Sequence, residues 1–266
     1  MGKSLKDIFA ELRNRKRVGV LPFIPAGYPD LNATRELLPA LERAGASTIE
    51  VGIPFSDPIA DGPVIQEAFT AALSRGLKLK EVLKTVREAR ASVSIPLVSM
   101  VSYSIVFRYG PERYFADAKA AGFDGLILPD LPPPEAESIC EKVKKAGLDT
   151  ILLVAPTTAR DRRKEIASLC SGFIYYLSVT GITGERQKLP EDLAEQLRQL
   201  KQISDTPVCV GFGISRREHV AQLSGLADGA IVGSAVVRRI KEHAGEGAAK
   251  IASAVESYVR ELVGPA

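Results

Sequence analysis

The chain has 266 residues, of which 45% are apolar and 25% charged, and its formal net charge is +3. Its three cysteines and two histidines exclude a disulfide scaffold and a three-histidine metal site. Basic and acidic residues number 35 and 32 and are interspersed, so no nucleic-acid-binding face is expected. No apolar run reaches the roughly 20 residues of a membrane helix. These features predict a soluble protein of the cytoplasm, with carboxylates as its acid–base groups if it is an enzyme.

Short runs rich in Val, Ile and Leu alternate with amphipathic stretches along the whole chain. The runs show little polar alternation, which is typical of parallel strands covered by helices. The predicted strands are 18–24, 48–53, 96–101, 125–129, 149–154, 173–178, 207–211 and 229–233. Helices are expected between them, with the first over 3–15, more than one within 62–92, and the last over 247–262.

Eight βα units in about 250 residues predict an α/β fold, a single TIM (β/α)8 barrel domain spanning residues 1–266. The extra N-terminal helix is expected to close the bottom of the barrel. A doubly wound sheet is the alternative architecture. Ser215 and Glu218 have the spacing of a capping box, so a capped helix is expected to follow Ser215.

Glu50 lies inside the apolar run TIEVGI. Because side chains alternate along a strand, Ile49 and Val51 point one way and Glu50 the other. If the two aliphatic residues face the helices, Glu50 points into the barrel, where desolvation raises the pKa of a carboxyl group. A barrel ion pair with a Lys or Arg remains the alternative at this stage.

The loop after this run carries two further acids, Asp57 and Asp61, between prolines. Either could simply form a turn, since Asp side chains bond their own backbone. Paired with Glu50 at one barrel end, however, Asp61 becomes the second of two carboxylates that can divide acid and base work.

Glycines follow the last three predicted strands, at 181–184 (GITG), 211–213 (GFG) and 233. Barrel loops seven and eight often form a phosphate site, because glycines and a helix N-terminus present backbone N–H groups to the anion. A tight turn is the alternative for 211–213 taken alone. Glycines at three successive strand ends together favour a phosphate-binding site over simple turns.

Residues 49–58 (IEVGIPFSDP) and 60–63 (ADGP) resemble the signature of the tryptophan synthase alpha subunit family. The likeness spans essentially the whole chain and includes 22–29 (PFIPAGYP), 128–132 (LPDLP), 181–184, 211–214 (GFGI) and 233–235 (GSA). The resemblance implies a TIM barrel that cleaves indole-3-glycerol phosphate to indole and glyceraldehyde 3-phosphate, a carbon–carbon lyase of tryptophan biosynthesis.

The resemblance also implies roles for single residues. Glu50 matches the family's acid–base glutamate, Asp61 the aspartate that accepts a hydrogen bond from the indole N–H, and Tyr175 the tyrosine beside the glutamate. Phe23 matches a wall of the indole pocket, and Thr183 the threonine of the loop that closes over substrate.

The family's phosphate cradle is matched by Gly184, Gly213, Gly233 and Ser234. The family works with a beta subunit in an α₂β₂ tetramer, and docking includes the loop that holds Asp57 and Pro58. No cofactor is implied for this chain, since pyridoxal phosphate belongs to the beta subunit.

Two positions depart from the family pattern. Ser104-Ile105 stand where many members have Asn-Pro, and Val179-Thr180 replace a pair that often begins with Arg.

Two other functions stay open at this stage. One is a different reaction on the same barrel, such as a sugar-phosphate isomerase or another indole-glycerol phosphate enzyme. The other is a catalytically silent alpha-like subunit that binds ligand and activates a partner.

Overall fold

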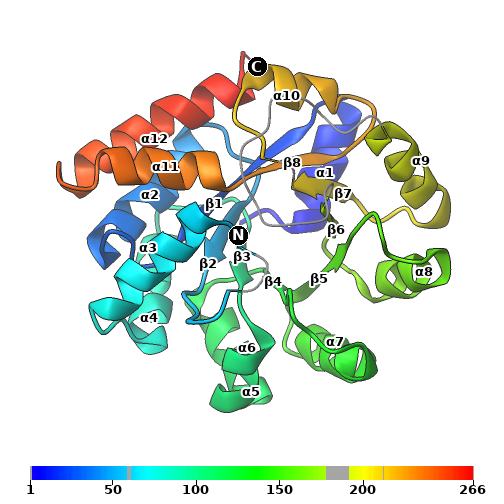
Figure 1. Ribbon diagram of the computed structural model, residues 1–266, viewed down its shortest axis with the longest axis horizontal. Helices are drawn as coiled ribbons and strands as arrows, with labels where there is room; N and C mark the ends of the chain where they lie inside the picture. Colours follow the sequence, from blue (N-terminus) through cyan, green and yellow to red (C-terminus); the bar gives the residue numbers. More distant parts are fainter. Residues whose placement is uncertain (1, 59–60, 178–191, 212, 266) are drawn as a thin grey trace.

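The computed structural model describes residues 2–58, 61–177, 192–211 and 213–265, and its strands form a closed parallel barrel in the order β1 to β8 (Figure 1). Closure of β8 onto β1 rules out the doubly wound alternative and confirms the TIM barrel. The eight predicted strands are all present, most of them shorter than expected. They are β1 (Gly19–Pro25), β2 (Ile49–Gly52), β3 (Leu97–Met100), β4 (Gly125–Ile127), β5 (Asp149–Val154), β6 (Ile174–Leu177), β7 (Val208–Gly211) and β8 (Gly229–Val232).

Helices form a ring around the strands, as Figure 1 shows. They are α1 (Leu5–Asn14), α2 (Leu31–Arg43), α3 (Pro63–Ser74), α4 (Leu79–Arg90), α5 (Tyr103–Tyr109), α6 (Pro111–Ala121), the 3₁₀ turn η1 (Pro133–Glu135), α7 (Ala136–Lys145), α8 (Arg160–Leu169), α9 (Leu193–Ile203), α10 (Arg217–Gln222), α11 (Ser234–Glu242) and α12 (Ala248–Val263). None of these described helices combines the length and apolar character needed to cross a membrane.

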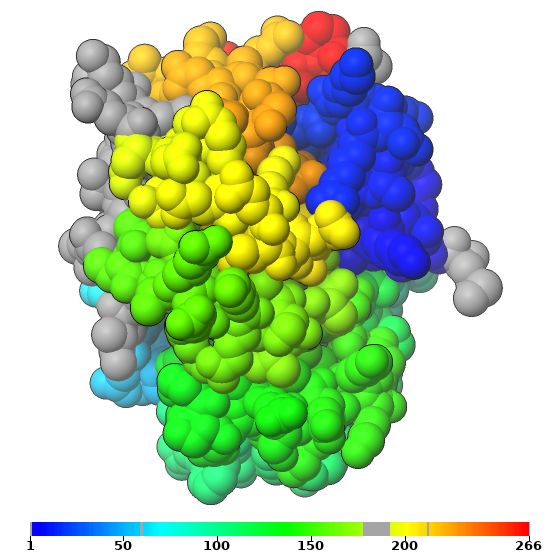
Figure 2. Space-filling model, turned by 90° about the vertical axis from the view of Figure 1, so that its right-hand side faces the viewer, coloured from blue at the N-terminus to red at the C-terminus, as the bar shows by residue number. Residues whose placement is uncertain are grey.

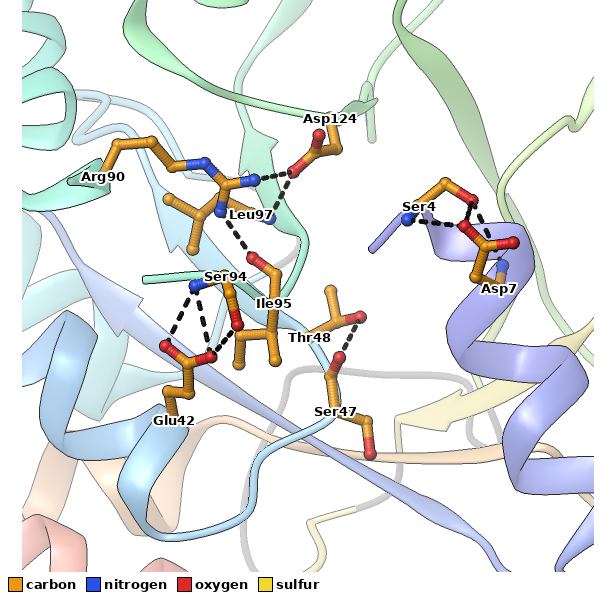
Figure 3. Close-up of polar contacts among 10 residues, drawn as sticks. All are labelled: Ser4, Asp7, Glu42, Ser47, Thr48, Arg90, Ser94, Ile95, Leu97 and Asp124. Atoms are coloured by element: carbon orange, nitrogen blue, oxygen red, sulfur yellow. Dashed lines mark hydrogen bonds and ion pairs between the residues drawn. The ribbon is translucent and has the colours of Figure 1, made fainter. Parts of the chain in front are cut away.

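The extra N-terminal helix is present as α1, and it closes the barrel at the amino-terminal ends of the strands. Its capping box is formed by Ser4 and Asp7, which exchange side-chain and backbone hydrogen bonds (Figure 3). Leu5 and Phe9 on its apolar face are buried in the barrel interior, and the Phe9 ring meets the edge of Phe173 at 5.8 Å between centroids. The interior of the lower half of the barrel is therefore packed core, so a site inside the barrel is expected at the opposite end.

The predicted capping box at Ser215 is not formed. Helix α10 begins at Arg217, its N-cap is Arg216, and no side chain caps it. The backbone of Ser215 is instead held by other groups, because its N–H donates to His219 Nδ1 and its carbonyl accepts from the Tyr258 hydroxyl at 2.9 Å. These two hydrogen bonds take the place of the capping box that the spacing of Ser215 and Glu218 predicts.

Two aspartates, one partly and one fully buried, join neighbouring strands at the amino-terminal end of the barrel. The Asp124 carboxylate accepts hydrogen bonds from the Leu97 N–H at 3.0 Å and from Arg90 at 3.1 Å (Figure 3). Each aspartate of this kind satisfies a backbone donor at the start of a strand that has no ladder partner there.

Asp228 makes the equivalent join between β7 and β8. It accepts from the Val208 N–H at 2.9 Å and from Arg13 Nε of α1 at 2.7 Å. Burial alone would raise the pKa of Asp228, but the hydrogen bonds from Arg13 and Val208 prevail and lower it below the usual value. The carboxylate thus fastens α1 to the barrel floor.

We expect Asp228→Ala to lower the free energy of unfolding by about 2–4 kcal/mol, because it leaves a buried N–H and the Arg13 guanidinium without their acceptor. Urea denaturation measures this loss. The matched control is Glu88→Ala, which breaks an exposed pair with Arg35 and should cost less than about 1 kcal/mol. Equal losses in the two variants would contradict the role given to Asp228.

Candidate active site

A cavity of about 440 Å³ opens at the carboxyl ends of β2, β3 and β4. This is the end of a TIM barrel at which active sites form. Its walls are mostly apolar, with a few polar groups. The lining residues are Ile53, Phe55, Asp57, Pro58, Asp61, Phe69, Met100, Val101, Ser102, Ser104, Pro129 and Asp130.

Glu50 lies in the middle of β2 and is fully buried. Its strand neighbours Ile49 and Val51 pack in the layer between strands and helices, whereas its partner in register, Val98, faces the barrel interior. Glu50 therefore points inward, the orientation that the alternation predicts. Within the described part of the chain neither carboxylate oxygen has a hydrogen-bond partner, so the alternative of a barrel ion pair finds no support there. Burial raises the pKa of Glu50 well above its usual value.

Asp61 and Tyr175 share this end of the barrel with Glu50. Burial raises the pKa of Asp61 to about 6. The Tyr175 hydroxyl has its pKa raised well above the usual value, first by burial and then by the negative charges of Glu50 and Asp61. Of the three groups only Asp61 lines the cavity, and Glu50 lies beneath it, closed off from solvent.

The two carboxyl groups thus occupy environments that separate their protonation states. Burial favours the neutral form of Glu50, which can donate a proton, whereas the pKa of about 6 leaves Asp61 mostly ionised at neutral pH and able to accept hydrogen bonds. Groups whose pKa values are pushed apart in this way are suited to divide acid and base work. No cluster of three His, Cys, Asp or Glu side chains able to hold a metal occurs among the described residues.

Two glycines at strand ends make room for the aromatic rings beside Glu50. A Cβ at Gly52 would overlap the ring of Phe23, which is the register partner of Glu50 on β1. A Cβ at Gly211 would lie 2.7 Å from Cε1 of Tyr175. Both rings can lie against these strand ends only because the two positions lack a side chain.

Three residues of the predicted phosphate cradle lie at the ends of the adjacent strands β7 and β8. Gly213 has a left-handed backbone with φ +74°, Gly233 precedes α11, and Ser234 is its buried first residue. Helix α11 has no side-chain cap, so its first N–H groups are available to an anion. The other two predicted ligand contacts, Thr183 and Gly184, lie outside the described residues.

The residues predicted to face a partner line the outer part of the cavity. Asp57 is exposed, its carboxylate accepts from the Ser56 hydroxyl at 2.6 Å, and Pro58 follows it. Ser104, one of the positions that depart from the family pattern, lines the same cavity. The other departure, Val179-Thr180, lies outside the described residues.

Asp130 is a site residue to which sequence analysis gave no role. Its carboxylate accepts from the Ser102 hydroxyl and the Tyr103 N–H, both at 2.6 Å. It therefore ties the loop after β3 to the loop after β4, and together these form one wall of the cavity. Its position directly after a predicted strand was the available signal, but its partners are 27 and 28 residues distant in sequence.

The raised pKa of Asp61 makes the fold less stable as the pH increases. Between about pH 4 and pH 6 the folded protein keeps a proton that the unfolded chain has lost, so the free energy of unfolding falls across this window. We expect Asp61→Asn to remove this fall and to be more stable than wild type at about pH 7.5 by roughly 1–3 kcal/mol. Urea denaturation at about pH 4.5 and about pH 7.5 measures it. Asp57→Asn, an exposed change in the same loop, is the control, and wild-type and Asp61→Asn curves that stay parallel would refute the assignment.

Gly52→Ala should displace the Phe23 ring. Because neither ring nor strand can yield without strain, we expect a loss of about 1–3 kcal/mol in the free energy of unfolding. Gly245→Ala is the control, since a Cβ there meets nothing within 4 Å. Thermal unfolding of both variants measures their stability relative to wild type. A Gly52→Ala protein as stable as wild type would show that the Phe23 ring is not confined.

Comparison with known proteins agrees with this geometry. The family model described as tryptophan synthase alpha chain matches residues 9–263. The chain is 46% identical to the tryptophan synthase alpha chain of Rhodopirellula baltica, over 90% of this chain and 87% of that one, and 45% identical to that of Chloroflexus aggregans, over 97% and 96%. A mutant tryptophan synthase alpha-subunit from Pyrococcus furiosus superposes with a TM-score of 0.85 at 40% identity, covering 93% of this chain and 98% of that one. Since similarity extends over nearly the whole length and the barrel carries the predicted carboxylates, this chain belongs to the tryptophan synthase alpha chain family.

Proposed function

We propose that Glu50 and Asp61 carry out the lyase reaction of the tryptophan synthase alpha chain, cleavage of indole-3-glycerol phosphate to indole and glyceraldehyde 3-phosphate. The observation that supports this most strongly is the fully buried Glu50 carboxyl group, which has no hydrogen-bond partner among the described residues and lies beneath a cavity that contains Asp61. Burying an unpaired carboxyl group lowers the free energy of unfolding, and a catalytic role accounts for its presence despite this cost.

Glu50 is the proton donor and acceptor in this proposal. Carbon–carbon cleavage requires that ring carbon C3 first gain a proton, so that the electrons of the breaking bond have a place to go. Glu50, neutral at physiological pH because burial raises its pKa, supplies that proton. The resulting carboxylate then takes the proton of the glycerol hydroxyl as the aldehyde forms, which restores the neutral acid. One proton enters and one leaves, and no external acid or base is consumed.

Asp61 stabilises the charged intermediate. Protonation at C3 places positive charge on the indole nitrogen, and an ionised carboxylate that accepts the N–H hydrogen bond favours this state. Its pKa of about 6 leaves Asp61 mostly ionised at neutral pH. Phe23, the register partner of Glu50 on β1, and Tyr175, whose hydroxyl senses the charge of Glu50, are the aromatic neighbours expected beside this group.

The phosphate is expected to bind at the other side of the site. Gly213, Gly233 and the amino end of α11 at Ser234 supply the backbone donors on the described side, and the resemblance adds Thr183 and Gly184. Anchoring a group remote from the reacting bond lets binding energy position the ring over Glu50.

A beta subunit is the partner that membership of this family implies. A related structure, that of tryptophan synthase from M. tuberculosis in its aminoacrylate-bound form, is 34% identical with a TM-score of 0.85, covering 98% of each chain. We infer an α₂β₂ tetramer in which Asp57 and Pro58 contribute to docking. The reaction proposed for this chain uses no cofactor, and pyridoxal phosphate is expected only in the beta subunit. The three cysteines are free and buried, which suits the reducing cytoplasm.

Glu50→Gln should lower the rate of indole release by 10²- to 10⁴-fold, the usual contribution of a general acid–base group. The assay follows indole formation from indole-3-glycerol phosphate, with and without a beta subunit. Glu67→Gln is the control, because Glu67 lies on the surface of α3 paired with Lys241. A wild-type protein that binds substrate but releases no indole under either condition would favour the silent alpha-like subunit instead.

A further inference from the structure

A second cavity, of about 480 Å³, lies at the amino-terminal end of the barrel, opposite the candidate active site. It is enclosed by the end of α1, the start of β1, the end of α2 and the end of α12. Figure 2 shows the blue amino-terminal segment and the red end of the chain together on this side of the molecule. Its volume falls within the range of about 300–1,000 Å³ that is typical of small-molecule sites.

The floor of this cavity is apolar. Ile8 of α1, Val20 of β1 and Ile95, which precedes β3, all line it and are at least nine-tenths buried. Ala44 and Ala46 complete the floor with small side chains. Such a surface accommodates the hydrocarbon body of a ligand.

The rim carries five cations: Lys3, Arg15, Arg17, Arg43 and Arg260. Two carboxylates pair with four of them. Glu11 binds Lys3 and Arg15, and Glu256 binds Arg43 and Arg260. Each carboxylate is thus shared between two cations.

Arg17 differs from the other four cations. Its guanidinium donates to the Val263 carbonyl at 3.2 Å, and no carboxylate of the described chain pairs with it. It is half-buried at the edge of the apolar floor. A guanidinium in this setting keeps donors that match a planar anion.

Helix ends account for part of this positive charge. Helices α1, α2 and α12 end at this face, and cations near a helix C-terminus offset its partial negative charge. At about half an elementary charge per helix, the three ends together contribute roughly one and a half negative charges. Five cations face two carboxylates and these helix ends, about three and a half negative charges in all, so the cavity keeps a positive excess of roughly one and a half charges.

We propose that this cavity binds a small amphipathic anion, with an apolar body on the Val20 floor and a carboxylate head at Arg17 and the arginine rim. Arginine forks bind carboxylates with two parallel hydrogen bonds, and the apolar floor selects an acid with a flat or branched hydrocarbon body. The site is separate from Glu50 and Asp61, so the proposal does not depend on the lyase reaction.

The probe is 4-iodobenzoate, with affinity measured by calorimetry and position by iodine anomalous scattering in co-crystals. We expect one site at Arg17, and an affinity at least about tenfold weaker in Arg17→Met, which keeps an apolar stem but loses the charged donors. Arg260→Met should weaken binding in the same direction. Arg35→Met, which removes an arginine on the outer surface of α2, should leave affinity unchanged.

Three results would overturn the proposal: iodine found only in the cavity beside Asp61, equal affinity in wild type and both rim variants, or equal binding of the uncharged 4-iodobenzyl alcohol. If Arg17→Met does not fold, Arg260→Met and the uncharged analogue still decide. Indole release by both rim variants is expected to equal that of wild type, so failure of this site leaves the proposed lyase function intact.

Discussion

One physical constraint dominates this barrel: the Glu50 carboxyl group is buried in it without a hydrogen-bond partner among the described residues. Burial favours the protonated form of this group, since a charged carboxylate there would lack compensation. The same constraint explains its surroundings. Gly52 and Gly211 leave space for the rings of Phe23 and Tyr175 at this end of the barrel, and in the proposed reaction the buried proton goes to the ring carbon of the substrate.

The two ends of the barrel differ in how their polar groups are paired and packed. At the amino-terminal end, α1 plugs the interior with Leu5 and Phe9, and Asp228 fastens that helix to β7 through Arg13 and Val208. These groups are paired and packed. At the carboxyl end, polar groups are left desolvated or unpaired, and loops form the walls of an open cavity. A rigid floor helps the upper end to hold its desolvated groups in place.

The barrel and the orientation of Glu50 were predictable because they follow from local patterns: apolar runs of strand length and the two-residue alternation along β2. Asp61 was predicted as the partner acid from its place in the loop after the same strand, and the family motifs agreed. Contacts distant in sequence were not predictable. The roles of Gly52 and Gly211 depend on rings from neighbouring strands, and Asp130 binds residues from the preceding βα unit. The capping box at Ser215 is replaced in part by such a contact, the hydrogen bond from the Tyr258 hydroxyl to the Ser215 carbonyl.

The proposed mechanism requires that Glu50 be a neutral acid at physiological pH. Carbon-13 NMR of protein labelled at glutamate side-chain carboxyls, titrated with pH, tests this directly, and Glu50→Gln identifies the resonance by its disappearance. We expect one resonance that stays protonated through neutral pH, because burial raises the pKa of Glu50 well above its usual value. A Glu50 resonance that titrates at the ordinary glutamate value, about 4.3, would rule this mechanism out, since an ionised group could not supply the first proton.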